Sequence, residues 1–197
     1  MIAATAIIYP GVTLGTNAVV EDFCIIGAPF AGQQGEPTVI GDNAVIRSHT
    51  VIYAGNIIGH RFQTGNKANI RELNRIGDDV SIGTLSVVEH HVEIGDGVRI
   101  HTQAFIPEFC VLKRGAWIGP RVTLTNAKFP KHPDAKQQLR GVVVEENAKV
   151  GANATVLPGV TIGTGALVGA GSLVAQDVPA GMVVKGAPAK AFRPVDY

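Results

Sequence analysis

Every sixth residue from Ile40 onward is a branched aliphatic residue, and this repeat constrains the fold more than any other feature. A period of six fits neither an amphipathic helix, which repeats every 3.6 residues, nor the strict alternation of a half-buried strand. A fixed short repeat indicates a stacked solenoid, and hexapeptide β-helices are one such class. The repeat positions, with Thr64 the one polar exception, are Ile40, Ile46, Ile52, Ile58, Thr64, Ile70, Ile76, Ile82, Val88, Ile94, Ile100, Ile106, Leu112, Ile118 and Leu124.

Each position of the repeat has a structural task. Three hexads make one triangular coil, and each hexad supplies a short strand and a corner. The branched residue points inward and stacks on its equivalent in the next coil, while a small residue four positions later fills the narrow interior. Gly frequently follows the branched residue, as at Gly77 and Gly95, and we expect Gly or Asn at corners to permit backbone angles that other residues disfavour. Because such a solenoid buries its core by stacking, it needs several coils.

Composition narrows the possible functions. The 197 residues suit one domain, charged residues make up 17% and aromatic residues 6%, and there are 24 glycines. The net charge is +1 without a basic block, so we expect no nucleic-acid partner. The sequence enters the repeat phase at Ile2 and Ile8, and it shows no signal peptide or membrane-spanning run. Cys24 and Cys110 fall on small inward positions, which indicates packed free thiols and a cytoplasmic protein.

Two insertions and a tail interrupt the repeat. The first is a polar Gly/Pro loop at about 31–38, and the second is a longer loop at about 127–142. We predict a β-helix over residues 1–178 and a C-terminal extension over residues 179–197. Both loops leave the same corner, after Ile26 and Leu124. Long loops in an otherwise regular solenoid are usually functional, although a loop can also merely cover an apolar edge.

A polar ladder is predicted at the corner from which the loops leave. Counting two residues beyond the repeat position in four successive coils gives Glu72, His90, Glu108 and Asn126. Stacked strands lie about 4.8 Å apart, so these side chains should line up. A histidine between two carboxylates suits a general base, and the alternative is a solvated polar ladder. His91 is expected to point the other way from His90.

Three segments resemble a known family. Phe62–Glu72 (FQTGNKANIRE) and Trp117–Pro130 (WIGPRVTLTNAKFP) resemble acetyltransferases that modify amino sugars carried on nucleoside diphosphates. The tail, with Gly186-Ala187-Pro188-Ala189-Lys190, resembles the terminus of coenzyme A-dependent hexapeptide-repeat transferases. The resemblance implies an all-β fold, a left-handed parallel β-helix solenoid with two corner loops and a short C-terminal extension. The handedness comes from this resemblance, since right-handed crossovers are the general rule.

The same resemblance implies a homotrimer that holds acetyl-CoA, as the acyl donor, in a groove between neighbouring prisms. Small corner residues after the second loop allow close approach of an extended pantetheine chain, and basic residues near the end of the chain suit nucleotide phosphates. These candidate cofactor-binding residues are Gly151, Ala152, Gly169, Ala170, Lys185, Lys190 and Arg193.

One departure from the family bears on the acceptor site. Members of the family often have Thr-Gly-His where this chain has Thr64, Gly65 and Asn66. Asn66 cannot act as a base, but it can orient a substrate, so we assign it to acceptor binding with Arg71 and Glu72. His90 is then the candidate base, unless the substrate's own groups manage the proton.

The sequence therefore predicts an acetyl-CoA-dependent acyltransferase that N-acetylates an amino sugar, with the sugar carried on a nucleotide. The candidate catalytic residues are His90, Glu108 and Asn126, where Asn126 or a backbone N–H stabilises the oxyanion. We expect no metal and no membrane partner. Three alternatives remain open: O- or N-acetyl transfer to another small acceptor, a zinc-dependent carbonic anhydrase-like protein, and a non-catalytic solenoid scaffold. The sugar, the nucleotide, the acyl length and the role of the first loop are not specified by the sequence.

Overall fold

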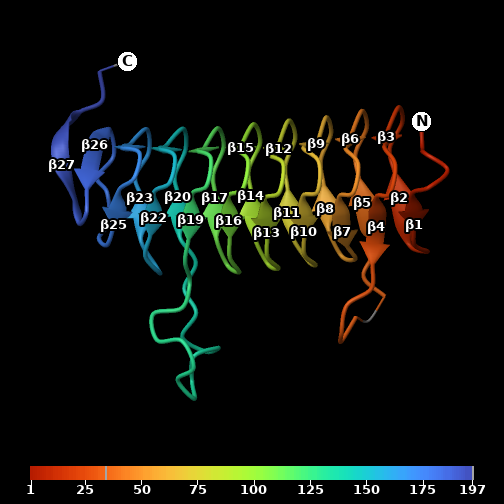
Figure 1. Ribbon diagram of the computed structural model, residues 1–197, viewed down its shortest axis with the longest axis horizontal. Helices are drawn as coiled ribbons and strands as arrows, with labels where there is room; N and C mark the ends of the chain where they lie inside the picture. The colour runs from red at the N-terminus through yellow and green to blue at the C-terminus, as the bar shows by residue number, and fades with distance from the viewer. Residues whose placement is uncertain (34, 197) are drawn as a thin grey trace.

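The chain winds into a three-sided prism in which each side is a β-sheet (Figure 1). This computed structural model describes residues 1–33 and 35–196. Residue 34, in the first predicted loop, and residue 197, at the end of the predicted C-terminal extension, lie outside the described residues. In the described part of the chain, no helical segment has the length and hydrophobicity that a bilayer crossing requires.

Successive strands go to successive sheets, so every third strand belongs to the same side. Sheet 1 contains β1 (Ile7–Ile8), β4 (Ile25–Ala28), β7 (Val51–Tyr53), β10 (Asn69–Ile70), β13 (Val87–Val88), β16 (Phe105–Ile106), β19 (Thr123–Leu124), β22 (Thr155–Val156) and β25 (Leu173–Val174). Sheet 2 contains β2 (Val12–Leu14), β5 (Thr38–Ile40), β8 (Ile57–Ile58), β11 (Arg75–Ile76), β14 (Glu93–Ile94), β17 (Val111–Leu112), β20 (Val143–Val144) and β23 (Thr161–Ile162). Sheet 3 contains β3 (Val19–Val20), β6 (Val45–Ile46), β9 (Gln63–Thr64), β12 (Ser81–Ile82), β15 (Arg99–Ile100), β18 (Trp117–Ile118), β21 (Lys149–Val150), β24 (Leu167–Val168), β26 (Met182–Gly186) and β27 (Ala189–Pro194).

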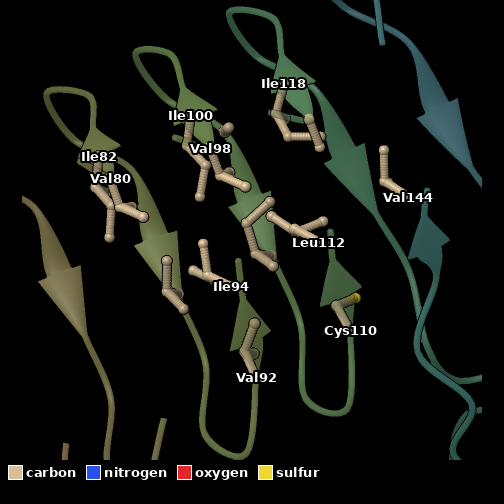
Figure 2. Close-up of a cluster of buried hydrophobic side chains, with 14 of the residues drawn as sticks. Val80, Ile82, Val92, Ile94, Val98, Ile100, Cys110, Leu112, Ile118 and Val144 are labelled. Atoms are coloured by element: carbon tan, nitrogen blue, oxygen red, sulfur yellow. The ribbon is translucent and has the colours of Figure 1, made fainter. Parts of the chain in front are cut away.

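The register between coils is the 18-residue period that the sequence predicts. Ile70 pairs in parallel with Ile52 on one side and Val88 on the other. The inward side chains of neighbouring coils therefore stack, as Ile82 and Ile100 do in Figure 2. The all-β left-handed parallel β-helix is confirmed, and its core is a column of Ile, Val and Leu side chains that are almost completely buried.

The polar exception in the core repeat is hydrogen-bonded. Thr64 is buried, and its hydroxyl accepts a hydrogen bond from the backbone N–H of Arg47 at 2.9 Å. The same hydroxyl lies 3.2 Å from the hydroxyl of Thr50. Burial of a polar group costs free energy unless it finds a partner, and these bonds explain how a threonine replaces an aliphatic residue in the column.

Gly and Asn at some corners adopt left-handed backbone angles as expected, at Gly97, Gly115 and Asn147 for example, but the glycines directly after the repeat position, such as Gly77, do not. Left-handed backbone angles at the corners fall mostly on other residues, among them Leu73, His91 and Phe109. At Gly77 the constraint is the next coil, because a Cβ atom would lie 2.8 Å from the backbone nitrogen of Asp96 and still closer to its carboxylate. These glycines are needed for close approach between coils.

Both insertions leave the prism at the corner between sheet 1 and sheet 2. The first connects β4 to β5 and the second connects β19 to β20, and Figure 1 shows both projecting from the same side of the prism. At the C-terminal end, β26 pairs in parallel with β24, and β27 turns back antiparallel to β26. Cys24 and Cys110 are buried and free, as predicted, and burial raises the pKa of the Cys110 thiol to about 12.

Candidate functional site

The four predicted ladder residues share the corner from which the two loops leave. Glu72 follows β10, His90 follows β13, Glu108 follows β16 and Asn126 follows β19. The period of the coil places them there, because residues separated by 18 positions occupy equivalent places in successive coils. We call this set of four residues the polar corner.

Three members of the polar corner are in contact. The Nε2 atom of His90 lies 3.2 Å from Oε1 of Glu108. Asn126 donates hydrogen bonds from its Nδ2 atom to Oε2 of Glu108 and, at 3.3 Å, to the backbone carbonyl of Glu108. The His90 and Glu108 side chains are about one quarter exposed, whereas Asn126 is buried. The carboxylate of Glu108 thus joins an imidazole to an amide, and the imidazole is accessible to solvent.

Glu72 is engaged mainly by its neighbour in sequence. The Arg71 guanidinium donates to both carboxylate oxygens of Glu72, at 2.8 and 3.0 Å, and lies 3.5 Å from Glu89. Burial alone would raise the pKa of Glu72, but the hydrogen bonds and positive charge of Arg71, with a smaller contribution from His90, hold that pKa below its usual value. Glu72 is therefore an ionised carboxylate, fixed beside the polar corner by Arg71.

The expectation that His91 points away from His90 is wrong. The Nδ1 atoms of the two rings lie 2.8 Å apart. Both residues lie beyond the end of β13, where the strand alternation no longer applies. The backbone of His91 has a φ of 55°, which turns the chain at the corner and brings its ring beside His90. Phe109, one coil away, packs near both rings with centroid distances of 6.2 and 5.9 Å.

The second loop is anchored at the polar corner. The backbone N–H of Arg140, near the end of the loop, donates to the carbonyl oxygen of Asn126 at 2.9 Å. Two residues later, the N–H of Val142 lies 3.4 Å from the Cys110 sulfur. These contacts close the base of the loop directly beside Glu108 and Asn126, so the loop and the polar groups form one structural unit.

A cavity of about 490 Å³ adjoins the polar corner on the side of sheet 2. His91 belongs to its wall, as does the end of the first loop. The lining residues are Glu36, Pro37, Gly55, Ile57, Leu73, Asn74, Arg75 and His91. A second hollow of about 560 Å³ on the outer face of sheet 2 shares Ile57 and Arg75 with it. This cavity could not be predicted from the sequence, because the end of the first loop and the corner residue His91 form part of its wall.

Asn66, predicted to bind the acceptor with Arg71 and Glu72, lies away from the polar corner. It follows β9 of sheet 3, at the corner between sheet 3 and sheet 1, and its Nδ2 atom donates to the Ser48 hydroxyl at 2.8 Å. The structure therefore brings Arg71 and Glu72 to the polar corner but places Asn66 at another corner of the same prism.

The small residues predicted to bind the cofactor lie at the corner that follows sheet 3. Gly151 and Ala152 follow β21, and Gly169 and Ala170 follow β24. A Cβ atom on Gly151 would lie 2.6 Å from the backbone nitrogen of Ala170. Stacking of the coils thus requires glycine at position 151, whatever ligand lies outside it.

The three predicted basic residues lie on the terminal hairpin. The Nζ atom of Lys185 lies 3.4 Å from the ring centroid of Phe192, a cation–π contact. Arg193 pairs with Asp196 at 2.7 Å. Lys190 is exposed at the start of β27. Lys185 and Arg193 therefore already have partners near the end of the chain, Phe192 and Asp196.

The arrangement of the possible metal ligands bears on the zinc alternative. Within residues 1–33 and 35–196, no group of three or more His, Cys, Asp and Glu side chains is arranged to hold a metal ion.

A family model matches part of the chain. The bacterial transferase hexapeptide family, described by six repeats, matches residues 75–108 and 141–176. Among curated proteins, the chain is 32% identical to the bifunctional protein GlmU of Alkaliphilus oremlandii, over 91% of this chain and 36% of that protein. The chain thus spans little more than a third of the length of that relative.

Two solved structures share the fold. LpxA from Bacteroides fragilis, described as a UDP-N-acetylglucosamine acyltransferase, superposes with a TM-score of 0.64 at 18% identity, covering 98% of this chain and 74% of that chain. The acetyltransferase domain of PglB from Neisseria gonorrhoeae, solved in complex with acetyl coenzyme A, superposes with a TM-score of 0.52 at 23% identity, covering 76% of this chain and 57% of that chain.

Proposed function

Because the chain is a hexapeptide-repeat protein with the left-handed β-helix fold, we propose that it is an acetyl-CoA-dependent acyltransferase that N-acetylates an amino sugar carried on a nucleotide. The observation that carries the proposal is the contact of His90, Glu108 and Asn126 at the base of the second loop. Support for the substrates comes from two proteins of the same fold, one solved with acetyl coenzyme A and one described as acting on UDP-N-acetylglucosamine.

The chemistry needs a proton acceptor and a group that stabilises negative charge. The unprotonated amine of the acceptor attacks the thioester carbonyl, and the amine proton leaves to the histidine that Glu108 orients. The Nδ2 atom of Asn126 donates to both the side chain and the backbone carbonyl of Glu108. The longer bond, at 3.3 Å to the carbonyl, gives way so that this N–H, or a backbone N–H in its place, stabilises the oxyanion. Collapse of the intermediate forms the amide, and the proton passes to the coenzyme A sulfur.

The remaining candidate residues have binding roles in this proposal. Arg71 and Glu72 hold hydroxyl groups of the acceptor sugar at the polar corner. Asn66 lies at a different corner, so its contact with the same acceptor requires a neighbouring subunit. We therefore place the acceptor in a cleft between two prisms, where holding both substrates together supplies much of the rate through proximity.

A homotrimer accounts for this cleft. Exposed apolar side chains gather on the outer face of sheet 1, at Ile7 and Phe105, and at its two corners, at Phe23, Leu85 and Phe109. Contact between subunits through this region would cover the apolar surface and place the polar corner at the interface. Acetyl-CoA then lies along the glycine and alanine corner that follows β21 and β24, with Lys190 near its phosphates.

The proposal also covers the two parts of the chain and the cellular compartment of the protein. Residues 1–178 form the catalytic β-helix and residues 179–197 form the extension. We place the protein in the cytoplasm, where its buried free thiols, Cys24 and Cys110, remain reduced.

The test is calorimetric titration of the purified protein with acetyl-CoA, beside free coenzyme A. We expect saturable binding near one molecule per chain, followed by turnover in a screen of nucleotide-linked amino sugars. Absence of binding by a folded trimer would overturn the proposal. In that case, stoichiometric zinc would point to a carbonic anhydrase-like protein, and absence of both ligands would point to a scaffold.

A further inference from the structure

Two adjacent histidine rings are in hydrogen-bonding contact at the polar corner. The Nδ1 atoms of His90 and His91 lie 2.8 Å apart, which is a hydrogen-bonding distance between nitrogens. An imidazole nitrogen is either a donor or an acceptor. One of these two atoms must therefore carry the proton while the other accepts it, because two lone pairs or two N–H groups at this distance would repel.

Glu108 decides which nitrogen carries the proton. Its carboxylate lies 3.2 Å from the other nitrogen of His90, Nε2, and an ionised carboxylate only accepts hydrogen bonds. Nε2 of His90 thus bears a proton, and in the neutral ring its Nδ1 atom is the acceptor. The proton between the rings then belongs to Nδ1 of His91, which leaves a lone pair on Nε2 of His91.

His91 is the histidine that reaches the open cavity. It lines the 490 Å³ cavity beside sheet 2 together with Arg75 and the end of the first loop, whereas His90 does not. The left-handed backbone of His91, with φ of 55°, and the ring of Phe109 fix its orientation. Among the described residues the structure shows no ion pair for Arg75, so this guanidinium is available to an anionic group of a ligand.

The charges around the pair favour transfer toward Glu108. Glu108 faces His90 from the coil that follows. Glu72, from the coil that precedes it, is close enough for the charge of His90 to affect its pKa, but Arg71 already balances Glu72. Glu89, beside His90 in sequence, also lies 3.5 Å from Arg71. The one guanidinium of Arg71 offsets only part of the charge of Glu72 and Glu89, and Glu36 lines the cavity with His91. Glu108 is the carboxylate in direct contact with an imidazole of the pair.

We propose that His91, rather than His90, accepts the proton of the acceptor amine. His90 is a positioning residue, which takes up the positive charge beside the carboxylate of Glu108. The inference rests on the proposed function. As the free amine of the acceptor forms its bond to the thioester carbonyl carbon, the amine nitrogen gives one proton to Nε2 of His91. The proton on Nδ1 of His91 moves to Nδ1 of His90, which becomes an imidazolium held by Glu108. After thioester cleavage the relay reverses, and the proton goes to the coenzyme A thiolate.

The test compares three variants with the wild type. His91→Asn keeps the left-handed backbone, which asparagine tolerates, and removes the imidazole. His90→Gln keeps a polar side chain but breaks the relay. His60→Asn is the control, because it removes a half-exposed imidazole at the corner between sheet 2 and sheet 3, away from both proposed binding corners.

We expect His91→Asn to lower kcat by about 100-fold or more, which is the range for loss of a general base. The variant should also lose the decrease of kcat at acid pH, the acid limb of the plot of kcat against pH. Its affinity for acetyl-CoA should stay unchanged. His90→Gln should lower kcat less and keep a displaced acid limb, and His60→Asn should match the wild type. A kcat of His91→Asn within about twofold of wild type across the pH range would overturn the proposal.

Nuclear magnetic resonance of ¹⁵N-labelled histidine separates failure of this inference from failure of the proposed function. In the wild type we expect His91 to be protonated at Nδ1 and unprotonated at Nε2, and His90 to be protonated at Nε2, whether or not any sugar is acetylated. In His90→Gln, the His91 tautomer should change. The opposite His91 tautomer in the wild type would refute the relay, even if acetyl transfer is demonstrated.

Discussion

Nε2 of His90 lies 3.2 Å from Oε1 of Glu108, although 18 residues separate the two along the chain. The coil period creates this contact, since the two residues occupy equivalent places after β13 and β16. Glu108 also accepts a hydrogen bond from Asn126. One carboxylate therefore orients both the imidazole and the amide that the proposed reaction needs.

Replacing Glu108 by glutamine tests this arrangement. The amide keeps the size of the side chain but removes the charge that stabilises an imidazolium, so we expect kcat to fall by about 10- to 100-fold with little change in KM for acetyl-CoA. Steady-state kinetics of Glu108→Gln would measure the changes in kcat and KM. Glu21→Gln, at another corner, is the control, and equal activity of the two variants would remove Glu108 from the mechanism.

The Arg71–Glu72 pair predicts a pH-dependent stability. Burial opposes ionisation of Glu72, but Arg71 outweighs it and lowers the pKa of Glu72 below its usual value of 4.5. A carboxyl group with a lowered pKa in the folded state stabilises the fold above its unfolded pKa, and this stabilisation is lost as the pH falls through the folded pKa. Glu72→Gln should therefore cost about 1 to 3 kcal/mol at neutral pH.

Thermal unfolding of wild type and Glu72→Gln between pH 7 and about pH 3 would measure the effect. We expect the difference in Tm to be complete at neutral pH, to begin to shrink below about pH 4.5, where the carboxyl group of the unfolded chain binds a proton, and to be lost as the pH falls through the lower pKa of the folded state. A difference that persists unchanged at acid pH would show that shape, rather than charge, stabilises this corner.

The period made much of this corner predictable. Because residues 18 positions apart stack, the sequence alone predicts that Glu72, His90, Glu108 and Asn126 lie in the same row. The period could not predict the directions that the side chains take. Glu72 turns to the adjacent Arg71 because a bidentate ion pair forms there, and only the backbone geometry reveals it.

The position of His91 illustrates the same limit. Alternation along a strand predicts that neighbouring side chains point to opposite faces, but β13 ends at Val88 and His91 adopts a left-handed backbone. The fold was predictable because every coil repeats the same core. The corner conformation of one residue, and the cavity beside it, depend on the particular side chains of neighbouring coils.

Gly77 tests the close-approach explanation of the repeat glycines. A Cβ atom there would lie 2.8 Å from the backbone nitrogen of Asp96, so Gly77→Ala forces two coils apart. We expect a loss of about 1 to 3 kcal/mol, measured as a lower Tm.

Gly97 provides the contrasting position. It has a φ of 67° and no atom within 4 Å of an added Cβ, and asparagine tolerates that backbone. Gly97→Asn should therefore change the Tm much less than Gly77→Ala. Equal effects of the two substitutions would contradict the distinction between close approach and backbone angle.

Phe105 tests the proposed trimer. Its side chain projects from the outer face of sheet 1 and is 37% exposed in the single chain. If neighbouring prisms pack on this face, Phe105→Glu places a charge in the interface, which costs far more than a charge on a free surface. We expect light scattering to report a trimer for the wild type and for Thr161→Glu, on the outer face of sheet 2, and a monomer for Phe105→Glu.

The monomer should also lose acetyl transfer, because the proposed cleft needs two subunits. A trimeric, active Phe105→Glu variant would move the interface to another face and separate the polar corner from it.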